Sequence, residues 1–155
     1  MAKELTVGGK APAFSLKTES GHTVSLKSLK GTEVVLYFYP KDDTPGCTKE
    51  ACGFRDSMKS IEKADAVVLG VSMDDADSHA RFIEKYGLPF SLLCDEDGTV
   101  SKAYGVYKKK NMYGRTYWGI ERSTFIIDEA GKLKAIFRKV KVDGHVAEVQ
   151  AALKG

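Results

Sequence analysis

Residues 34–52 read VVLYFYPKDDTPGCTKEAC, and this stretch decides the fold. Its first six residues form a continuous apolar run rich in β-branched and aromatic types, which predicts a strand covered on both faces. Apolar residues then recur at helical spacing after Pro45-Gly46, at positions 51, 54, 58 and 61, which predicts a helix. The chain therefore leads from a buried strand through a short loop into a helix.

The other apolar patterns extend this arrangement on both sides. Strands are expected over residues 14–17, 22–26, 66–72, 91–94, 123–128 and 133–138, and helices over 76–86 and 146–153, with Asp143 as the candidate cap of the last helix. Alternating strands and helices followed by a hairpin predict an α/β protein with a central mixed sheet. The order is compatible with a thioredoxin-like fold that carries an N-terminal β-hairpin, in a single domain over residues 1–155.

Composition narrows the class of protein. The chain has 155 residues, a net charge of +3 and no apolar segment long enough to span a membrane. It also lacks the pattern of a secretory signal, and three cysteines make no disulfide framework. We therefore expect a cytoplasmic protein with neither nucleic acid nor membrane as a partner. The dense cluster Lys108-Lys109-Lys110 is expected to be part of a solvated loop.

Cys47 occupies an unusual place for a thiol. It falls in the first turn of the expected helix, where unpaired backbone N–H groups and the helix dipole favour a thiolate. Thr44 precedes it by three residues, so its hydroxyl can point at the same spot. Pro40 and Pro45 fix the backbone of the loop. These features indicate a reactive cysteine.

Cys52 is the candidate partner of Cys47. Five residues along a helix turn it by roughly 140° from Cys47, onto the face of Asp56, Lys59 and Lys63 that is expected to be wet. Two Cα atoms at this spacing lie about 8 to 9 Å apart in an intact helix. Because a disulfide needs them within about 7 Å, a bond requires local melting between Pro45 and Phe54.

Other uses of the cysteines and histidines are open at this stage. Cys47 and Cys52 are alternatively two small helix residues in a core, whereas Cys94 is expected to be a buried structural thiol. No Cys or His cluster has the spacing of a zinc site. The histidines, at positions 22, 79 and 145, are isolated in the sequence and are expected to be surface or structural residues.

The residues around Cys47 resemble the active-site signature of the peroxiredoxins, which is Pro, three residues, Thr or Ser, two residues, then Cys. Pro40, Thr44 and Cys47 meet it in full. The longer run over residues 37–52 resembles the bacterioferritin comigratory protein branch, also called peroxiredoxin Q. The resemblance continues along nearly the whole chain, from residues 11–14 through 121–125 to 140–153.

The resemblance implies a reaction and a set of roles. Cys47 would be the peroxidatic thiolate that becomes a sulfenic acid, with Thr44 hydrogen-bonding the peroxide and Pro40 screening the sulfur from water. Arg122 would stabilise the thiolate and the negative charge on the leaving oxygen, and Glu50 would orient Arg122.

The resemblance also implies how the cycle closes. Cys52 would be the resolving thiol that forms a disulfide with Cys47 before further oxidation. Thioredoxin is the usual reductant of such relatives, or glutaredoxin in some, and no cofactor or metal is implied. The branch contains monomers and dimers, so a monomer and a weak homodimer are both compatible with the sequence.

Two rival functions use the same residues. A general thiol–disulfide oxidoreductase on a thioredoxin fold would carry Cys-x-x-Cys, whereas this chain has four residues between Cys47 and Cys52. A redox sensor would use the disulfide as a switch for a partner and would be oxidised once per event. The preferred hydroperoxide stays open, and the aromatic and basic segment 107–118 is read as a loop that either shapes this preference or is a plain surface loop.

Overall fold

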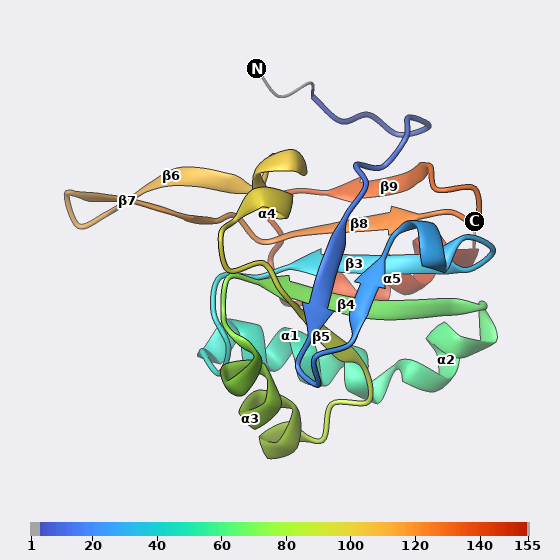
Figure 1. Cartoon of the computed structure of the whole chain (residues 1–155), viewed down its shortest axis with the longest axis horizontal. Helices are drawn as coiled ribbons and strands as arrows, with labels where there is room; N and C mark the ends of the chain where they lie inside the picture. Colours follow the sequence, from blue (N-terminus) through green and yellow to red (C-terminus); the bar gives the residue numbers. More distant parts are fainter. Residues whose placement is uncertain (1–3, 155) are drawn as a thin grey trace.

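A mixed seven-stranded sheet forms the centre of the computed structural model, which describes residues 4–154 (Figure 1). Its strand order is β2-β1-β5-β4-β3-β8-β9, and β6 and β7 form a separate two-stranded sheet. The strands are β1 Ser15–Thr18, β2 Thr23–Ser25, β3 Glu33–Phe38, β4 Ala66–Ser72, β5 Ser91–Cys94, β6 Tyr107–Met112, β7 Arg115–Ile120, β8 Ser123–Ile127 and β9 Leu133–Phe137.

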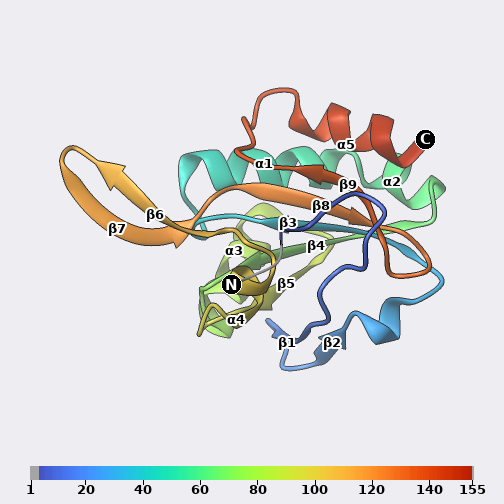
Figure 2. The same ribbon diagram turned by 90° about the horizontal axis from the view of Figure 1, so that it is seen from above.

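Helices connect and cover the strands. They are the 3-10 helix η1 Lys27–Leu29 and the α-helices α1 Pro45–Asp56, α2 Met58–Lys63, α3 Ala76–Tyr86, α4 Thr99–Ala103 and α5 His145–Lys154. Figure 2 shows α1, α2 and α5 lying along one side of the sheet, with β1 and β2 at the edge of the sheet farthest from β9. No helix among residues 4–154 is long and apolar enough to cross a membrane.

Strand β3 is central because both of its faces are apolar. Val35 and Tyr37 point into the core beneath α1, whereas Leu36 and Phe38 point into the core on the opposite face of the sheet. The strand pairs in parallel with β4 and antiparallel with β8, so its backbone is satisfied along both edges. This confirms the predicted strand that is covered on both faces, and it fixes the starting point of the loop to Cys47.

The predicted fold class is confirmed at the two ends of the sheet. At one end β8 and β9 form the expected antiparallel hairpin, with an irregularity between Ile126 and Ile127. At the other end β1 and β2 form the N-terminal hairpin, and β1 joins β5 through the pairs Lys17–Cys94 and Thr18–Leu93.

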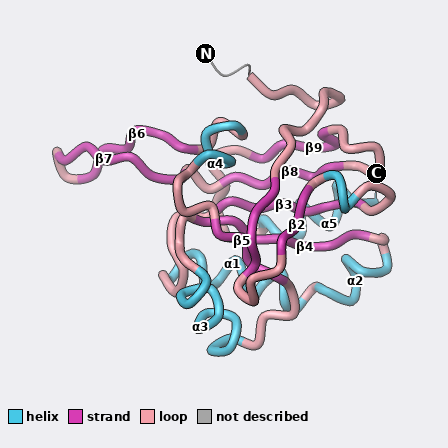
Figure 3. The backbone as a smooth tube through the Cα atoms, viewed as in Figure 1, coloured by secondary structure: helices cyan, strands magenta, loops and turns pink. Residues whose placement is uncertain are grey.

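Residues 107–118 were expected as a loop, and this prediction was wrong. They belong to the hairpin of β6 and β7, which carries Lys108 to Lys110 on a strand and projects from the body (Figure 3). Tyr113 and Gly114 occupy its turn with φ of 51° and 79°, the left-handed backbone that a tight two-residue hairpin turn requires. Apolar periodicity missed β6 because most of its side chains are polar.

Two helix details also differ from the sequence-based expectations. The apolar stripe over 51–61 is divided between α1 and α2, because Ser57 ends the first helix with φ −106° and ψ 6°. Asp143 pairs through its carboxylate with Lys49 of α1, and Gly144 separates it from the start of α5 at His145. Asp143 therefore ties the segment before α5 to α1, and its predicted role as a cap was wrong.

Candidate active site

The first turn of α1 holds Cys47 where the sequence placed it. Thr44 precedes the helix in an extended conformation, Pro45 is its first residue, and the Thr48 N–H donates to the Thr44 carbonyl at 2.8 Å. The N–H groups of Gly46 and Cys47 lie ahead of that bond and have no intrahelical partner. Only 1% of Cys47 is exposed, so a thiol with two backbone donors beside it is shielded from bulk water.

Arg122 faces this thiol from the junction between β7 and β8. Its Nη2 donates to Cys47 Sγ at 3.3 Å, and its Nη1 donates to Glu50 Oε1 at 2.7 Å. Gly46 makes this approach feasible, because a Cβ there would lie 3.1 Å from Arg122 Nη2. The sequence-predicted residues Cys47, Glu50 and Arg122 thus form one chain of contacts, although 72 residues separate Glu50 from Arg122.

Burial and ion pairing oppose each other at Glu50. Burial raises the pKa of Glu50 to about 7, and the positive charge of Arg122 and its hydrogen bond act in the opposite direction. Burial also acts against the charge on Arg122, but the negative charges of Glu50 and Cys47 outweigh it and raise the pKa of the guanidinium. The guanidinium is therefore a fixed cation, whereas Glu50 can exchange a proton near neutral pH.

The loop from Pro40 to Thr44 is anchored by a buried acid. Tyr39 donates through its hydroxyl to Asp42 Oδ1 at 2.5 Å, and Ser78 donates to Oδ2 at 2.8 Å. His79 Nδ1 lies 2.6 Å from Oδ2, and its Nε2 lies 2.9 Å from the Leu93 carbonyl. Because a carbonyl only accepts, Nε2 carries a proton, and the ring bridges α3, the loop and β5.

Asp42 and His79 form an ion pair inside the protein. Burial alone would lower the pKa of His79, but the hydrogen bond and the charge of Asp42 outweigh it and raise that pKa. Asp74 lies beside them, and these three residues have the donor types of a metal site. Both ring nitrogens of His79 are already engaged in hydrogen bonds, so we read the group as the anchor of the loop.

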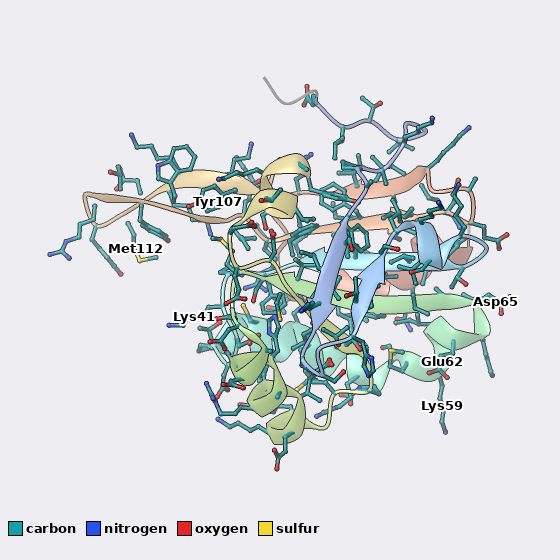
Figure 4. All side chains as sticks on the ribbon, in the orientation of Figure 1. Lys41, Lys59, Glu62, Asp65, Tyr107 and Met112 are labelled. Carbon is teal, nitrogen blue, oxygen red and sulfur yellow. The ribbon has the colours of Figure 1, made fainter. Side chains whose placement is uncertain are left out.

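Thr44 and Pro40 lie on the loop that leads from β3 to Cys47. The Thr44 hydroxyl donates to the Lys41 carbonyl at 2.9 Å, so its lone pairs remain as acceptors. The sequence predicted only that this hydroxyl can face the thiol. Pro40 is exposed at the end of β3, where it begins the loop. Figure 4 labels the neighbouring Lys41 at the edge of the molecule on this side.

Cys52 lies on α1 beside a groove. Its side chain is half-buried, so it is more accessible than Cys47. It is less exposed than predicted, because the sequence placed it on the solvent-exposed face of the helix. The groove runs between α1 and the start of α5 and is lined by Lys49, Glu50, Cys52, Gly53, Asp56, Val142, Asp143, Gly144, Val146 and Ala147. Both cysteines are reduced and belong to an uninterrupted helix. The predicted need for unwinding before a disulfide forms therefore applies to this conformation.

Cys94 has a different environment. It ends β5 and is half-buried, and burial raises its pKa to about 11, with the negative charges of Glu96 and Glu19 adding to the effect. The thiol therefore stays protonated at neutral pH. Cys94 was expected to be a buried structural thiol, and it is less buried than predicted.

Sequence reasoning missed three residues that support the site. His79 and Asp42 are far apart in the chain, and no local sequence pattern predicts that they pair. Lys110 turns its amine to the Ile120 carbonyl at the base of the hairpin. Burial lowers the pKa of Lys110, the positive charge of Arg122 lowers it further, and the charge of Cys47 raises it. Lys110 therefore places a second amine or ammonium group at the base of the hairpin, two residues in sequence from Arg122 through its contact with Ile120.

A shielded thiol held against a guanidinium at a helix start defines a thiol-dependent redox enzyme. A profile of the AhpC/TSA family matches residues 7–136. The putative peroxiredoxin bcp of Coxiella burnetii is 58% identical over 149 residues, which are 96% of this chain and 99% of that protein. Peroxiredoxin Bcp of Bacillus subtilis is 52% identical over 150 residues, which are 97% of this chain and 96% of that protein.

A solved structure agrees with these relatives. The Xanthomonas campestris bacterioferritin comigratory protein, described for its alkyl peroxide reduction activity, has a TM-score of 0.90 and 42% identity over 96% of this chain and 98% of that chain. The chain belongs to the AhpC/TSA family and, within it, to the Bcp peroxiredoxins, which are peroxidases. Such enzymes act on peroxides and take their electrons from a thiol reductant.

Proposed function

We propose that this chain reduces hydrogen peroxide and organic hydroperoxides through Cys47, resolves the product with Cys52 and is recycled by thioredoxin. The observation that carries the proposal is the 3.3 Å contact between Arg122 Nη2 and Cys47 Sγ at the start of α1. A permanent cation and a helix N-terminus both favour negative charge on this sulfur. The alkyl peroxide activity of the Xanthomonas campestris relative supports the substrate class.

In the first step the Cys47 thiolate attacks the terminal oxygen of the peroxide. The S–O bond forms as the O–O bond breaks, which oxidises the sulfur to a sulfenic acid. The leaving oxygen takes a proton and departs as an alcohol, or as water when the substrate is hydrogen peroxide. Negative charge moves from sulfur to this oxygen, and Arg122 with the free N–H groups of Gly46 and Cys47 stabilises it throughout.

Three other residues position these reactants. Thr44 accepts the peroxide O–H through the lone pairs that its bond to Lys41 leaves free. Glu50 Oε1 accepts a hydrogen bond from Arg122 Nη1 at 2.7 Å, so the guanidinium stays oriented toward the sulfur. Pro40 screens the entrance to the thiol from water, because it begins the rigid loop above it.

The second step needs a conformational change. The Cys52 thiolate attacks the sulfenic sulfur, the S–S bond forms, and the displaced hydroxide takes a proton to become water. The first turns of α1 must unwind to bring the two Cα atoms within about 7 Å. The pair between Lys49 and Asp143 is exposed on both sides, so breaking it adds little to the cost.

Reduction completes the cycle in a reducing compartment, which we propose is the cytoplasm. A dithiol of thioredoxin attacks the Cys47–Cys52 bond, restores both thiols and leaves with its own disulfide. Cys52 and its groove are the accessible side of that bond, since Cys47 is nearly fully buried. Glutaredoxin is the alternative reductant.

A coupled assay tests the whole proposal. The protein is supplied with hydrogen peroxide, thioredoxin, thioredoxin reductase and NADPH, and NADPH consumption is followed. We expect steady turnover by the native chain, none by Cys47→Ser, and a single oxidation without turnover by Cys52→Ser. Oxidation of the native chain without turnover by thioredoxin or glutaredoxin would contradict the recycling step and favour the sensor. Full turnover by Cys52→Ser would exclude Cys52 as the resolving thiol.

A further inference from the structure

The hairpin of β6 and β7 stands apart from the rest of the molecule. Figures 1 and 2 show it projecting beyond the body, and its two strands pair with no other strand of the described chain. A two-stranded ribbon alone in water is marginally stable. Such a projection is therefore expected to serve a contact outside the chain.

Charge is concentrated on this hairpin. Residues 107–120 contain Lys108, Lys109, Lys110 and Arg115 and no acidic residue, which gives +4. The whole chain carries +3, so all the other residues together carry −1. Lys108, Lys109 and Arg115 are exposed, whereas Lys110 turns to the Ile120 carbonyl. The net positive charge of the protein is thus presented at one protruding point.

The same hairpin carries the exposed apolar side chains. Tyr113 is 98% exposed, Trp118 59%, Met112 55% and Tyr117 42%. Over residues 4–154 the single other large apolar residue with such exposure is Val7. The only tryptophan of the chain is therefore turned to solvent, on a strand beside cations.

Strand register places cations and apolar groups side by side on both faces. Trp118 is opposite Lys109 and stacks on Tyr107 with ring centroids 5.5 Å apart. On the other face Met112 is opposite Arg115, and Tyr117 is opposite Lys110. Figure 4 labels Tyr107 at the base of the ribbon and Met112 near its tip.

We propose that this hairpin docks onto the surface of an anionic lipid bilayer. Lys and Arg bind anionic headgroups, while Trp and Tyr favour the boundary between headgroups and acyl chains. A narrow projecting hairpin can enter the soft interface of a bilayer, whereas a protein partner would need a surface complementary to it. Equal charge on two hairpins disfavours a tip-to-tip dimer, and Trp118 is already covered on one face by Tyr107.

The docked orientation places the base of the hairpin, which leads to Arg122, on the membrane-facing side of the molecule. β7 ends at Ile120, two residues before Arg122, and the Lys110 amine donates to the Ile120 carbonyl at the base of the hairpin. The proposal departs from the sequence-based expectation of no membrane partner, which rested on the lack of a spanning segment; surface docking needs none. It does not depend on the peroxidase mechanism, since none of the contacting side chains belongs to it.

Vesicle binding tests the proposal on the full chain. Reduced protein is mixed with phosphatidylcholine vesicles with and without phosphatidylglycerol, and partitioning is measured by sedimentation. The fluorescence of Trp118 reports the hairpin directly, because the chain has no other tryptophan. We expect binding and a blue shift of Trp118 emission on the anionic vesicles alone, both reversed by salt.

Matched variants locate the contact. Lys108→Glu with Lys109→Glu should weaken partitioning by roughly twentyfold or more, at about fivefold for each cation lost. Lys27→Glu with Lys30→Glu makes the same charge change at exposed positions on and beside η1. This control should weaken binding only by the small amount that the lower net charge of the whole protein causes. Met112→Ser with Tyr113→Ser should remove the blue shift. All three variants should keep the native rate with hydrogen peroxide in solution.

Other results would overturn the proposal. Equal loss of binding in the two charge-reversed variants would make the effect one of net charge, not of the hairpin. Failure to bind anionic vesicles at low salt, or tighter binding to a single-stranded oligonucleotide that K108E/K109E abolishes, would assign the hairpin to another partner or to none.

Discussion

Cys47 and Cys94 are thiols of one chain with opposite surroundings. Cys47 is almost fully buried, yet Arg122 lies 3.3 Å from its sulfur and a helix begins beneath it. Cys94 is half-buried, and burial raises its pKa to about 11, with the negative charges of Glu96 and Glu19 adding to the effect. Burial alone would rank the two in the wrong order of reactivity. A cation lies against Cys47, whereas acidic residues act on Cys94, so the charges around the two thiols differ in sign.

The largest effect is expected from exchanging the two thiols for hydroxyls. Cys47→Ser should lower the peroxide reaction rate by about 10³-fold or more, because it removes the nucleophile. Cys94→Ser should stay within about twofold of the native rate, since a protonated thiol contributes no nucleophile. Stopped-flow consumption of hydrogen peroxide by the reduced proteins measures both. A comparable loss of peroxide reaction rate in both variants would show that the two thiols do not differ in reactivity.

Removing the cation should have the next largest effect. Arg122→Met should slow the reaction of Cys47 by about 10²- to 10³-fold, because the charge that stabilises thiolate and leaving oxygen is lost. Arg122→Lys keeps the charge without the two-pronged geometry and should recover part of the rate. Arg138→Met is the control, since Arg138 donates to the Tyr104 and Gly105 carbonyls. A native rate in Arg122→Met would show that the guanidinium is not needed.

Displacing the same guanidinium should have a smaller effect. In Gly46→Ala the new Cβ would lie 3.1 Å from Arg122 Nη2, so the side chain must shift, and we expect about a tenfold slower reaction. Gly53→Ala is the matched control on α1, because its Cβ would meet Val146 Cγ2 at 3.0 Å instead. It should alter stability through α5 and leave the peroxide rate near native. The prediction fails if the two variants slow the reaction equally.

The smallest effect concerns stability against pH. The pKa of Glu50 is raised from 4.5 to about 7, so the folded state holds this proton more tightly than the unfolded chain. The resulting stabilisation is complete below about pH 4.5 and is lost as pH rises to about 7, a change on the order of 3 kcal/mol. Glu50→Gln cannot titrate and should flatten urea-unfolding free energies over this window. If the unfolding free energy of Glu50→Gln changes with pH as it does in the native chain, Glu50 is not the group that titrates in this window.

The sheet was predictable because its strands are apolar on both faces. Residues 34–39 and 123–127 read as strands without any knowledge of their partners, and both lie in the centre of the sheet. The β6–β7 hairpin was not predicted, since a Lys-rich strand with no layer beneath it carries no apolar period. The break at Ser57 was also missed, because the apolar stripe continues across it.

The site was predictable to the extent that its signal is local. Cys47, Thr44 and Pro40 fall within one loop and helix start, and the resemblance to peroxiredoxins pointed to Glu50 and Arg122. The anchor of that loop was not predictable, because Asp42 and His79 meet only when α3 packs beside the loop. Lys110 was missed for the same reason, since strand pairing with β7 brings its amine to the Ile120 carbonyl.

The most direct test of the central claim is a disulfide map after one equivalent of hydrogen peroxide. The reduced protein is oxidised, digested without reductant and analysed by mass spectrometry. We predict one new bond, between Cys47 and Cys52, with Cys94 left as a free thiol. Cys47 recovered as a sulfinic acid without a bridge, or bridged to Cys94, would contradict the account.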